Sequence, residues 1–221
     1  LRALAQSTFD RDGRIFPTRP AMIEVPEQGR ARGSQGEALW MAENRPMGAL
    51  ITYWIKDAAR SMRQRRQDTT RAAEAKNASP RYPTQQELTA EADEEAPQTL
   101  MTITDEKGRI VRRLVVPGGR GIHRYVWNLR GTAPTTGGGG FGGGGGGPDD
   151  PPAIPTSTGG GSFVQPGTYR IALSRRIDGT VTELGEPQTL TVTADPGVTL
   201  TPAQRTAAAE YHGQVDKLQR A

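Results

Sequence analysis

Short stretches in which apolar and polar residues alternate recur along the chain, and each is bounded by glycine, proline or charged residues. They cover Met47–Lys56, Gln98–Thr104, Arg109–Val116, Gly121–Leu129, Thr168–Ser174 and Gln188–Ala194. A period of two is typical of strands that bury one face of a sheet, and the boundaries are typical of turns. We therefore predict a mainly β protein, built on an immunoglobulin-like or fibronectin-III-like β-sandwich over residues 20–196.

The aromatic residues of these stretches indicate which face of each strand is buried. In Gly121–Leu129, Tyr125 and Trp127 share one side, and we expect this more aromatic side to face the core. The aromatic residues expected in the structural core are Tyr53, Trp54, Tyr125, Trp127 and Tyr169. They matter more than usual here, because only 5% of the chain is aromatic.

Three segments lack this alternation and divide the chain. Residues 1–19 carry few periodic apolar positions and are predicted to form an N-terminal arm or connector. Residues 57–97 are predicted to be an insertion with helical character, in which Thr84 and Glu87 match a capping box that begins a short acidic helix. Residues 197–221 are predicted to form a C-terminal helix, because a threonine, a proline and a glutamine suit its first positions.

Residues 131–165 form a glycine-rich loop inside the predicted sandwich, since strands are predicted on both sides of it. Within this loop, Gly137–Gly147 consists of glycine except at Phe141. The tract lacks the Gly-Lys-Ser/Thr ending of a phosphate-binding loop. It is either a flexible surface loop or a segment ordered against a neighbouring subunit, with Phe141 as an apolar anchor.

The C-terminal helix carries a narrow apolar stripe. Ala207, Tyr211, Val215 and Leu218 follow one another at helical spacing. Such a stripe must be covered, either by the sandwich of this chain or by a missing domain or partner protein. The candidate partner-binding residues are therefore Phe141, Tyr211, Val215 and Leu218.

Charge is unevenly distributed along a chain whose formal net charge is +4. Five arginines between Arg60 and Arg71 are followed by five acidic residues between Glu87 and Glu95. The basic run contains no aromatic residue on which a base could stack, and its counter-charge follows closely. We expect a solvated helix face rather than a nucleic-acid site.

No constellation of catalytic or metal-binding residues is apparent in the sequence. The chain has no cysteine, and its two histidines, His123 and His212, are far apart. The adjacent carboxylates at 94–95 and 149–150 are expected in solvated loops, and no apolar run approaches the roughly 20 residues that span a bilayer. We therefore predict no enzymatic activity, no cofactor, no metal site and no transmembrane segment.

Four motifs occur in a fixed order along the chain. They are Glu43-Asn44-Arg45-Pro46-Met47-Gly48-Ala49, Asp105 to Leu114, Gly121 to Arg130 and Pro166-Gly167-Thr168-Tyr169. Together they resemble the C-terminal region of bacterial sortilin-like, BNR-repeat β-propeller proteins, which are often labelled glycosyl hydrolases. The family's third motif ends Trp-Asp-Leu-Arg, whereas this chain has Asn128 at the aspartate position, which would keep a hydrogen bond and lose the charge. The sandwich also resembles the immunoglobulin-like domain of flagellar hook-capping proteins, which is an assembly module.

The resemblance implies that the propeller, with any glycosidase chemistry, lies outside this chain. We expect a non-catalytic interaction module, exported to the periplasm or cell surface, that binds protein partners as an accessory subunit of a larger cell-envelope assembly. The alternative is the accessory C-terminal domain of a propeller glycosidase, with a carbohydrate contact at Trp40. Because the chain begins at Leu1 without a leader, we expect a processed product or part of a longer protein.

Overall fold

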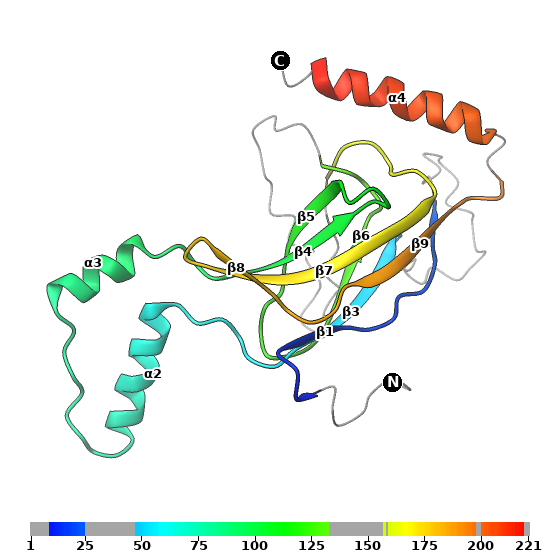
Figure 1. Ribbon diagram of the computed structural model, residues 1–221. Coiled ribbons are helices and arrows are strands. Elements are labelled where there is room, and N and C mark those ends of the chain that lie inside the picture. The colour runs from blue at the N-terminus through cyan, green and yellow to red at the C-terminus, as the bar shows by residue number, and fades with distance from the viewer. Residues whose placement is uncertain (1–8, 25–46, 133–156, 158, 198–199, 219–221) are drawn as a thin grey trace, which may run out of the picture.

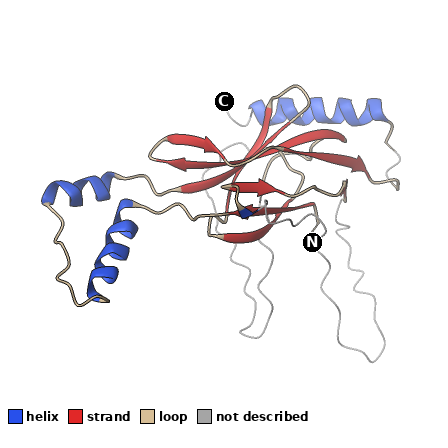
Figure 2. Cartoon of the chain, turned by 60° about the horizontal axis from the view of Figure 1, so that its bottom comes forward, coloured by secondary structure: helices blue, strands red, loops and turns tan. Residues whose placement is uncertain are grey.

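The computed structural model describes residues 9–24, 47–132, 157, 159–197 and 200–218, and it contains two packed β-sheets (Figure 1). The smaller sheet has the strand order β1 (Gly13–Ile15), β3 (Ala49–Ile55) and β6 (Gly121–Trp127). The larger sheet has the order β2 (Ala21–Ile23), β9 (Gln188–Ala194), β7 (Gly167–Ile177), β4 (Gln98–Thr104) and β5 (Ile110–Val116), and β8 (Thr180–Glu183) also pairs with β7. Figure 2 shows the two sheets as separate layers. The predicted mainly β sandwich is confirmed.

The order of the strands follows the immunoglobulin-like pattern. β1, β3 and β6 take the places of strands A, B and E in one sheet, and β5, β4, β7 and β9 take those of C′, C, F and G in the other. β2 runs parallel to β9, and the other strand pairs in the described part of the chain are antiparallel. Because β3 and β4 belong to different sheets, the predicted insertion 57–97 occupies the crossover between strands B and C.

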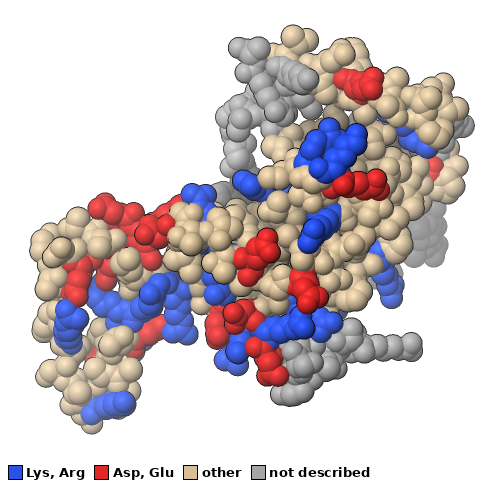
Figure 3. All heavy atoms as spheres, in the orientation of Figure 1, with Lys and Arg blue, Asp and Glu red and all other residues tan. Residues whose placement is uncertain are grey.

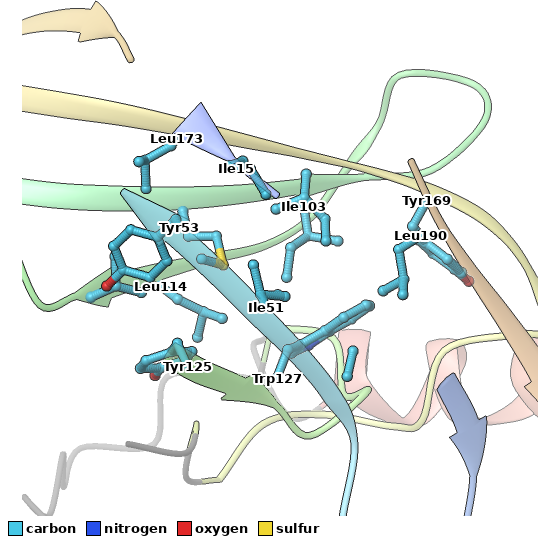
Figure 4. Packing of buried hydrophobic residues seen from close by; sticks show 14 of the residues in the cluster. Ile15, Ile51, Tyr53, Ile103, Leu114, Tyr125, Trp127, Tyr169, Leu173 and Leu190 are labelled. Atoms are coloured by element: carbon cyan, nitrogen blue, oxygen red, sulfur yellow. The ribbon is translucent and has the colours of Figure 1, made fainter. Parts of the chain in front are cut away.

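The core lies between the two sheets and is filled by alternate residues of each strand (Figure 4). Fully or almost fully buried apolar side chains come from β3, β4, β7 and β9, namely Ile51, Ile55, Met101, Ile103, Ile171, Leu173 and Leu190. The aromatic side chains of Tyr53, Tyr125, Trp127 and Tyr169 are buried in the same core. The indole Nε1 of Trp127 donates to the carbonyl oxygen of Arg130 at 3.0 Å, so its one polar atom has a partner.

Tyr169 closes one end of the core. Its ring meets that of Trp127 edge-on, with centroids 5.7 Å apart, and its hydroxyl donates to the carbonyl oxygen of Gln165 at 2.6 Å. A tyrosine near the start of strand F with such a bond is the tyrosine corner of immunoglobulin-like domains. Burial, with Asp105 and Glu106 nearby, raises the pKa of Tyr169 to about 12, so the hydroxyl stays protonated and can donate.

Trp54 does not occupy the core position predicted for it. Ile51, Tyr53 and Ile55 point inward from β3, so the pleat turns Trp54 to the outer face of the smaller sheet. There its ring meets that of Phe9 edge-on, with centroids 4.9 Å apart. Two neighbouring aromatic residues of one strand must face opposite sides, and the isoleucines in phase with Tyr53 decide which of them is buried.

Part of the predicted N-terminal arm belongs to the sandwich. β1 pairs with β3 along its whole length, and its residue Ile15 is fully buried in the core. A strand of three residues is too short to show a period of two in the sequence. For this reason residues 1–19 look like a connector, although residues 13–15 complete the smaller sheet.

Residues 57–97, which we call the arm, extend away from the sandwich and contain α2 (Met62–Glu74) and α3 (Gln85–Asp93) (Figure 1). Both helices begin with a capping box, and the one predicted from Thr84 and Glu87 is present at the start of α3. No residue of either helix is buried. The arm is therefore a projection without a core of its own.

The C-terminal helix α4 (Pro202–Leu218) lies beside the end of the sandwich where β7 begins and β2 and β9 end. Its first turn is fixed by reciprocal bonds, because Gln204 Oε1 accepts from the backbone of Thr201 at 2.8 Å and Thr201 Oγ1 accepts from the backbone of Gln204 at 3.3 Å. The helix therefore begins where the sequence predicts.

Candidate docking surfaces

Charged side chains, rather than an apolar core, join the two helices of the arm. Arg66 of α2 and Glu91 of α3 form a bidentate ion pair, with Nε–Oε1 and Nη2–Oε2 distances of 2.6 and 2.9 Å. Arg81, between the helices, lies 2.7 Å from Glu87. The hydrogen bond from Arg66 holds the pKa of Glu91 below its ordinary value, so both partners are charged at neutral pH.

Two consecutive arginines of β7 hold the root of the arm. Arg175 donates through Nη2 to the carbonyl oxygen of Asp57, where the chain leaves the sandwich. Arg176 Nη2 lies 2.9 Å from Glu95 Oε2, where the chain returns to it. Both ends of the arm are thus bonded to β7, and these contacts orient the arm relative to the sandwich.

The arm exposes apolar side chains around a shallow groove. A groove of about 370 Å³ lies between α2 and α3, and its apolar lining includes Met62, Ala73, Pro83 and Ala90. Nearby, Tyr82 is 85% exposed. Figure 3 shows the basic side chains of the arm in a band beside its acidic ones. Arg66 and Arg81 are paired with glutamates, whereas the apolar side chains of Met62, Tyr82 and Leu88 are exposed.

The ends of the glycine-rich loop are fastened to each other beside β5. Arg130, before the loop, forms an antiparallel bridge with Phe163, after it. The Arg112 guanidinium donates to the carbonyl oxygens of Arg130, Gly131 and Gly159 at 3.3, 3.2 and 3.1 Å. The chain therefore enters and leaves the loop at one place. The candidate anchor Phe141 lies outside the described residues.

Asn128 belongs to the stem of the loop, by which we mean the joined ends around Arg130 and Phe163. Its side-chain amide both accepts and donates hydrogen bonds. Its Oδ1 accepts from Arg112 Nη1 at 3.4 Å and from the backbone N–H of Arg130 at 3.3 Å, and its Nδ2 donates to the carbonyl oxygen of Gly159 at 2.8 Å. An ionised aspartate could accept the first two bonds but could not donate the third. The asparagine amide thus links Arg112 and Arg130 to Gly159 on the far side of the loop.

The apolar stripe of α4 is divided between two environments. Tyr211 and Leu218 are 64% and 77% exposed. Val215 is half-buried and faces a groove between the helix and the sandwich. The sandwich therefore covers only part of the stripe. Trp40, the candidate carbohydrate contact, lies outside the described residues.

Few of the described side chains are arranged as they would be in a catalytic, metal-binding or sugar-binding site. Among them, no cluster of three or more His, Cys, Asp or Glu side chains could hold a metal ion. His123 is packed, since its ring stacks on Tyr53 with centroids 5.4 Å apart and its Nε2 lies 2.7 Å from the carbonyl oxygen of Gly119. The exposed aromatics Tyr82 and Tyr211 lie on separate elements, the arm and α4, and so do not form a joint platform for a sugar.

In the part of the chain that the structure describes, no helix has the length and apolar character needed to cross a membrane.

The sequence does not reveal the main contacts of the arm. These are the ion pair of Arg66 with Glu91 and the contacts that Arg175 and Arg176 make with the arm. Their partners are 25 to 118 positions apart, and only the charge runs of opposite sign hint at the first pair.

The fold and these surfaces define an immunoglobulin-like sandwich that carries a helical arm between strands B and C and a C-terminal helix. No family model, curated protein or solved structure matches the chain. The resemblance to sortilin-like propeller proteins therefore stays a prediction.

Proposed function

We propose that the chain is a non-catalytic interaction module, exported to the periplasm or cell surface, that serves as an accessory subunit of a larger cell-envelope assembly. The arm is the observation that carries this proposal. Its helices order 13 and 9 residues without burying any of them. A projection of this kind suits contact with another molecule better than support of the sandwich.

The energetics of the arm favour a partner. Fixing the backbone costs roughly 1–2 kcal/mol per residue, and isolated helices shorter than about 12–15 residues are marginal in water. In general, an ion pair between exposed side chains returns only about 0–1 kcal/mol. The pair of Arg81 with Glu87 is of this exposed kind. A partner that covered Met62, Leu88 and Tyr82 would add apolar burial, which stabilises by about 25 cal/mol per Å².

The exposed half of the α4 stripe supports the same function from another side of the molecule. Tyr211 and Leu218 are large, apolar and exposed, although the helix has an ordered cap and lies beside the sandwich. Two separated elements with uncovered apolar side chains are expected of a subunit that touches its neighbours at more than one place.

Limited trypsin digestion tests the proposal, because α2 offers several arginines as cleavage sites. We expect rapid cleavage within α2 in the isolated chain and protection of the same sites in native envelope fractions. Lys107, in the exposed turn between β4 and β5, serves as an internal reference site for protease activity. Equal cleavage of α2 in both preparations, or equal protection in both, would refute docking through the arm.

A matched pair of variants sharpens the test. Tyr82→Ser removes the most exposed apolar side chain of the arm, and Val181→Ser removes a side chain of β8 that is 57% exposed. We expect Tyr82→Ser to restore cleavage of α2 in the envelope fraction and Val181→Ser to leave the protection intact. The opposite pattern would place the contact on the β7–β8 hairpin instead of the arm.

A further inference from the structure

A groove of about 590 Å³ separates α4 from the end of the sandwich. Its size lies in the range of about 300–1,000 Å³ that is typical of small-ligand sites. One wall is formed by Phe163, Val164 and Pro166, just before β7, and the other by Ala208, Ala209 and Val215 of α4. Apolar side chains thus lie on both sides of the groove, which is built from segments about 40 positions apart in the sequence.

Two arginines face this apolar groove from opposite walls. The Arg130 guanidinium lies 3.9 Å from the centroid of the Phe163 ring, and its Nη1 donates to the carbonyl oxygen of Gly161 at 3.1 Å. Arg205 donates through Nη1 to the carbonyl oxygen of Leu200. These contacts hold each guanidinium in place while leaving further N–H donors on both.

The charge of the groove is unbalanced. In the described part of the chain, no carboxylate forms an ion pair with Arg130 or Arg205. Among the described residues that line the groove, Asp195 is the one acidic residue, and its Oδ1 accepts a bond from the backbone of Gly197 at 2.7 Å. Two guanidinium groups and one carboxylate leave an excess of positive charge beside apolar walls.

We propose that this groove binds an apolar carboxylate, a ligand with an aliphatic or aromatic body and a single carboxylate group. The body would replace water along the apolar walls, and the carboxylate would accept hydrogen bonds from Arg130 and Arg205. Arginine suits this role because its planar donors match the two oxygens of a carboxylate. The inference concerns α4 and the sandwich alone and does not depend on the arm.

The test compares two probes that differ in charge, 3-phenylpropionate and 3-phenylpropan-1-ol, each titrated into the full chain while backbone amide NMR signals are recorded. We expect saturable shifts of the Gly161, Val164 and Ala209 amides with the acid. The alcohol should bind at least about tenfold more weakly, which corresponds to about 1.4 kcal/mol and lies near the lower end for a hydrogen bond to a charged group. Equal affinity of the two probes, or the absence of saturable shifts at these amides, would overturn the proposal.

Variants test which arginine binds the carboxylate of the acid. Arg205→Gln should weaken binding of the acid by about tenfold or more and leave binding of the alcohol unchanged, whereas Arg113→Gln, on the exposed face of β5, should change neither. Arg130→Gln also removes the contact with Phe163, so Arg205→Gln is the decisive variant. An unchanged sandwich amide spectrum shows that it has folded. If Arg113→Gln weakened binding as much as Arg205→Gln, the acid would be responding to overall charge, and the groove would not be its site.

Discussion

Gly185, in the connection between β8 and β9, tests how closely β1 is packed into the sandwich. A Cβ atom at this position would lie 2.3 Å from the carbonyl oxygen of Gly13, and the backbone has a φ of +80°. Gly13 faces the same restriction, because its own Cβ would lie 2.8 Å from the Cβ of Leu184. The two segments therefore pass each other where neither can carry a side chain, and Gly185→Ala should force them apart.

The expected loss of stability has two parts, and a matched variant separates them. Alanine in the left-handed region costs about 1–2 kcal/mol, and a side chain forced into a packed site costs typically about 1–3 kcal/mol. Gly108 has a φ of +75° and no atom within 4 Å of its Cβ position, so Gly108→Ala carries only the first cost. We expect the free energy of unfolding to fall by about 2–5 kcal/mol for Gly185→Ala and by about 1–2 kcal/mol for Gly108→Ala.

Urea unfolding followed by tryptophan fluorescence measures both variants, and the slope m should stay constant if only the folded state is strained. In the native state, Trp54 pairs in register with Arg14 of β1, so a displaced β1 should also shift the Trp54 emission to longer wavelength. If the two variants differed by less than about 0.5 kcal/mol, the usual limit of additivity for independent sites, the close contact of β1 with the β8–β9 connection would be refuted.

Three further predictions concern the sandwich end, the loop stem and the arm. Tyr169→Phe should lower the free energy of unfolding by about 0.5–1.5 kcal/mol through loss of its hydrogen bond to the backbone, whereas Tyr82→Phe, at an exposed position, should leave urea unfolding unchanged; equal effects would contradict a tyrosine corner. Asn128→Ala should cost about 1–3 kcal/mol in the same assay, because it leaves polar groups of the stem without partners, and an unaltered midpoint would show that water replaces the amide. Hydrogen bonds lower the pKa of Glu87 and Glu91, so the two charged carboxylates stabilise the arm above the ordinary glutamate pKa of about 4.3, and this stabilisation is lost as pH falls through the lowered values. In that acidic range, circular dichroism should show loss of helix while tryptophan fluorescence still reports a folded sandwich. Simultaneous loss of both signals would contradict an arm that unfolds independently.

The sequence predicts those features that depend on neighbours a few residues away. Alternation places Tyr125 and Trp127 correctly on a buried face, and the capping box of Thr84 with Glu87 is readable because both bonds lie within one turn. The buried face of β3 is harder to predict, since Tyr53 and Trp54 are adjacent and therefore face opposite sides. Which of them is buried depends on which side of the strand meets the second sheet. The ion pairs of the arm join helices whose relative placement no local pattern encodes.

The arm and the groove beside α4 differ in how much of their charge is already paired, and this determines what each can bind. On the arm, Arg66 is satisfied by Glu91, so a partner would gain mainly from apolar burial, which salt does not screen. In the groove, Arg130 and Arg205 exceed the single carboxylate of Asp195, and an anionic ligand would gain from charge that is only partly exposed to water. Salt largely screens exposed charges that lie more than a Debye length apart, about 8 Å at 0.15 M ionic strength, and it screens close, partly buried pairs less. Added salt should therefore weaken an acid bound in the groove only in part, through its longer-range attraction to the two arginines, while apolar burial on the arm is not screened, so the salt dependence of binding distinguishes the two surfaces.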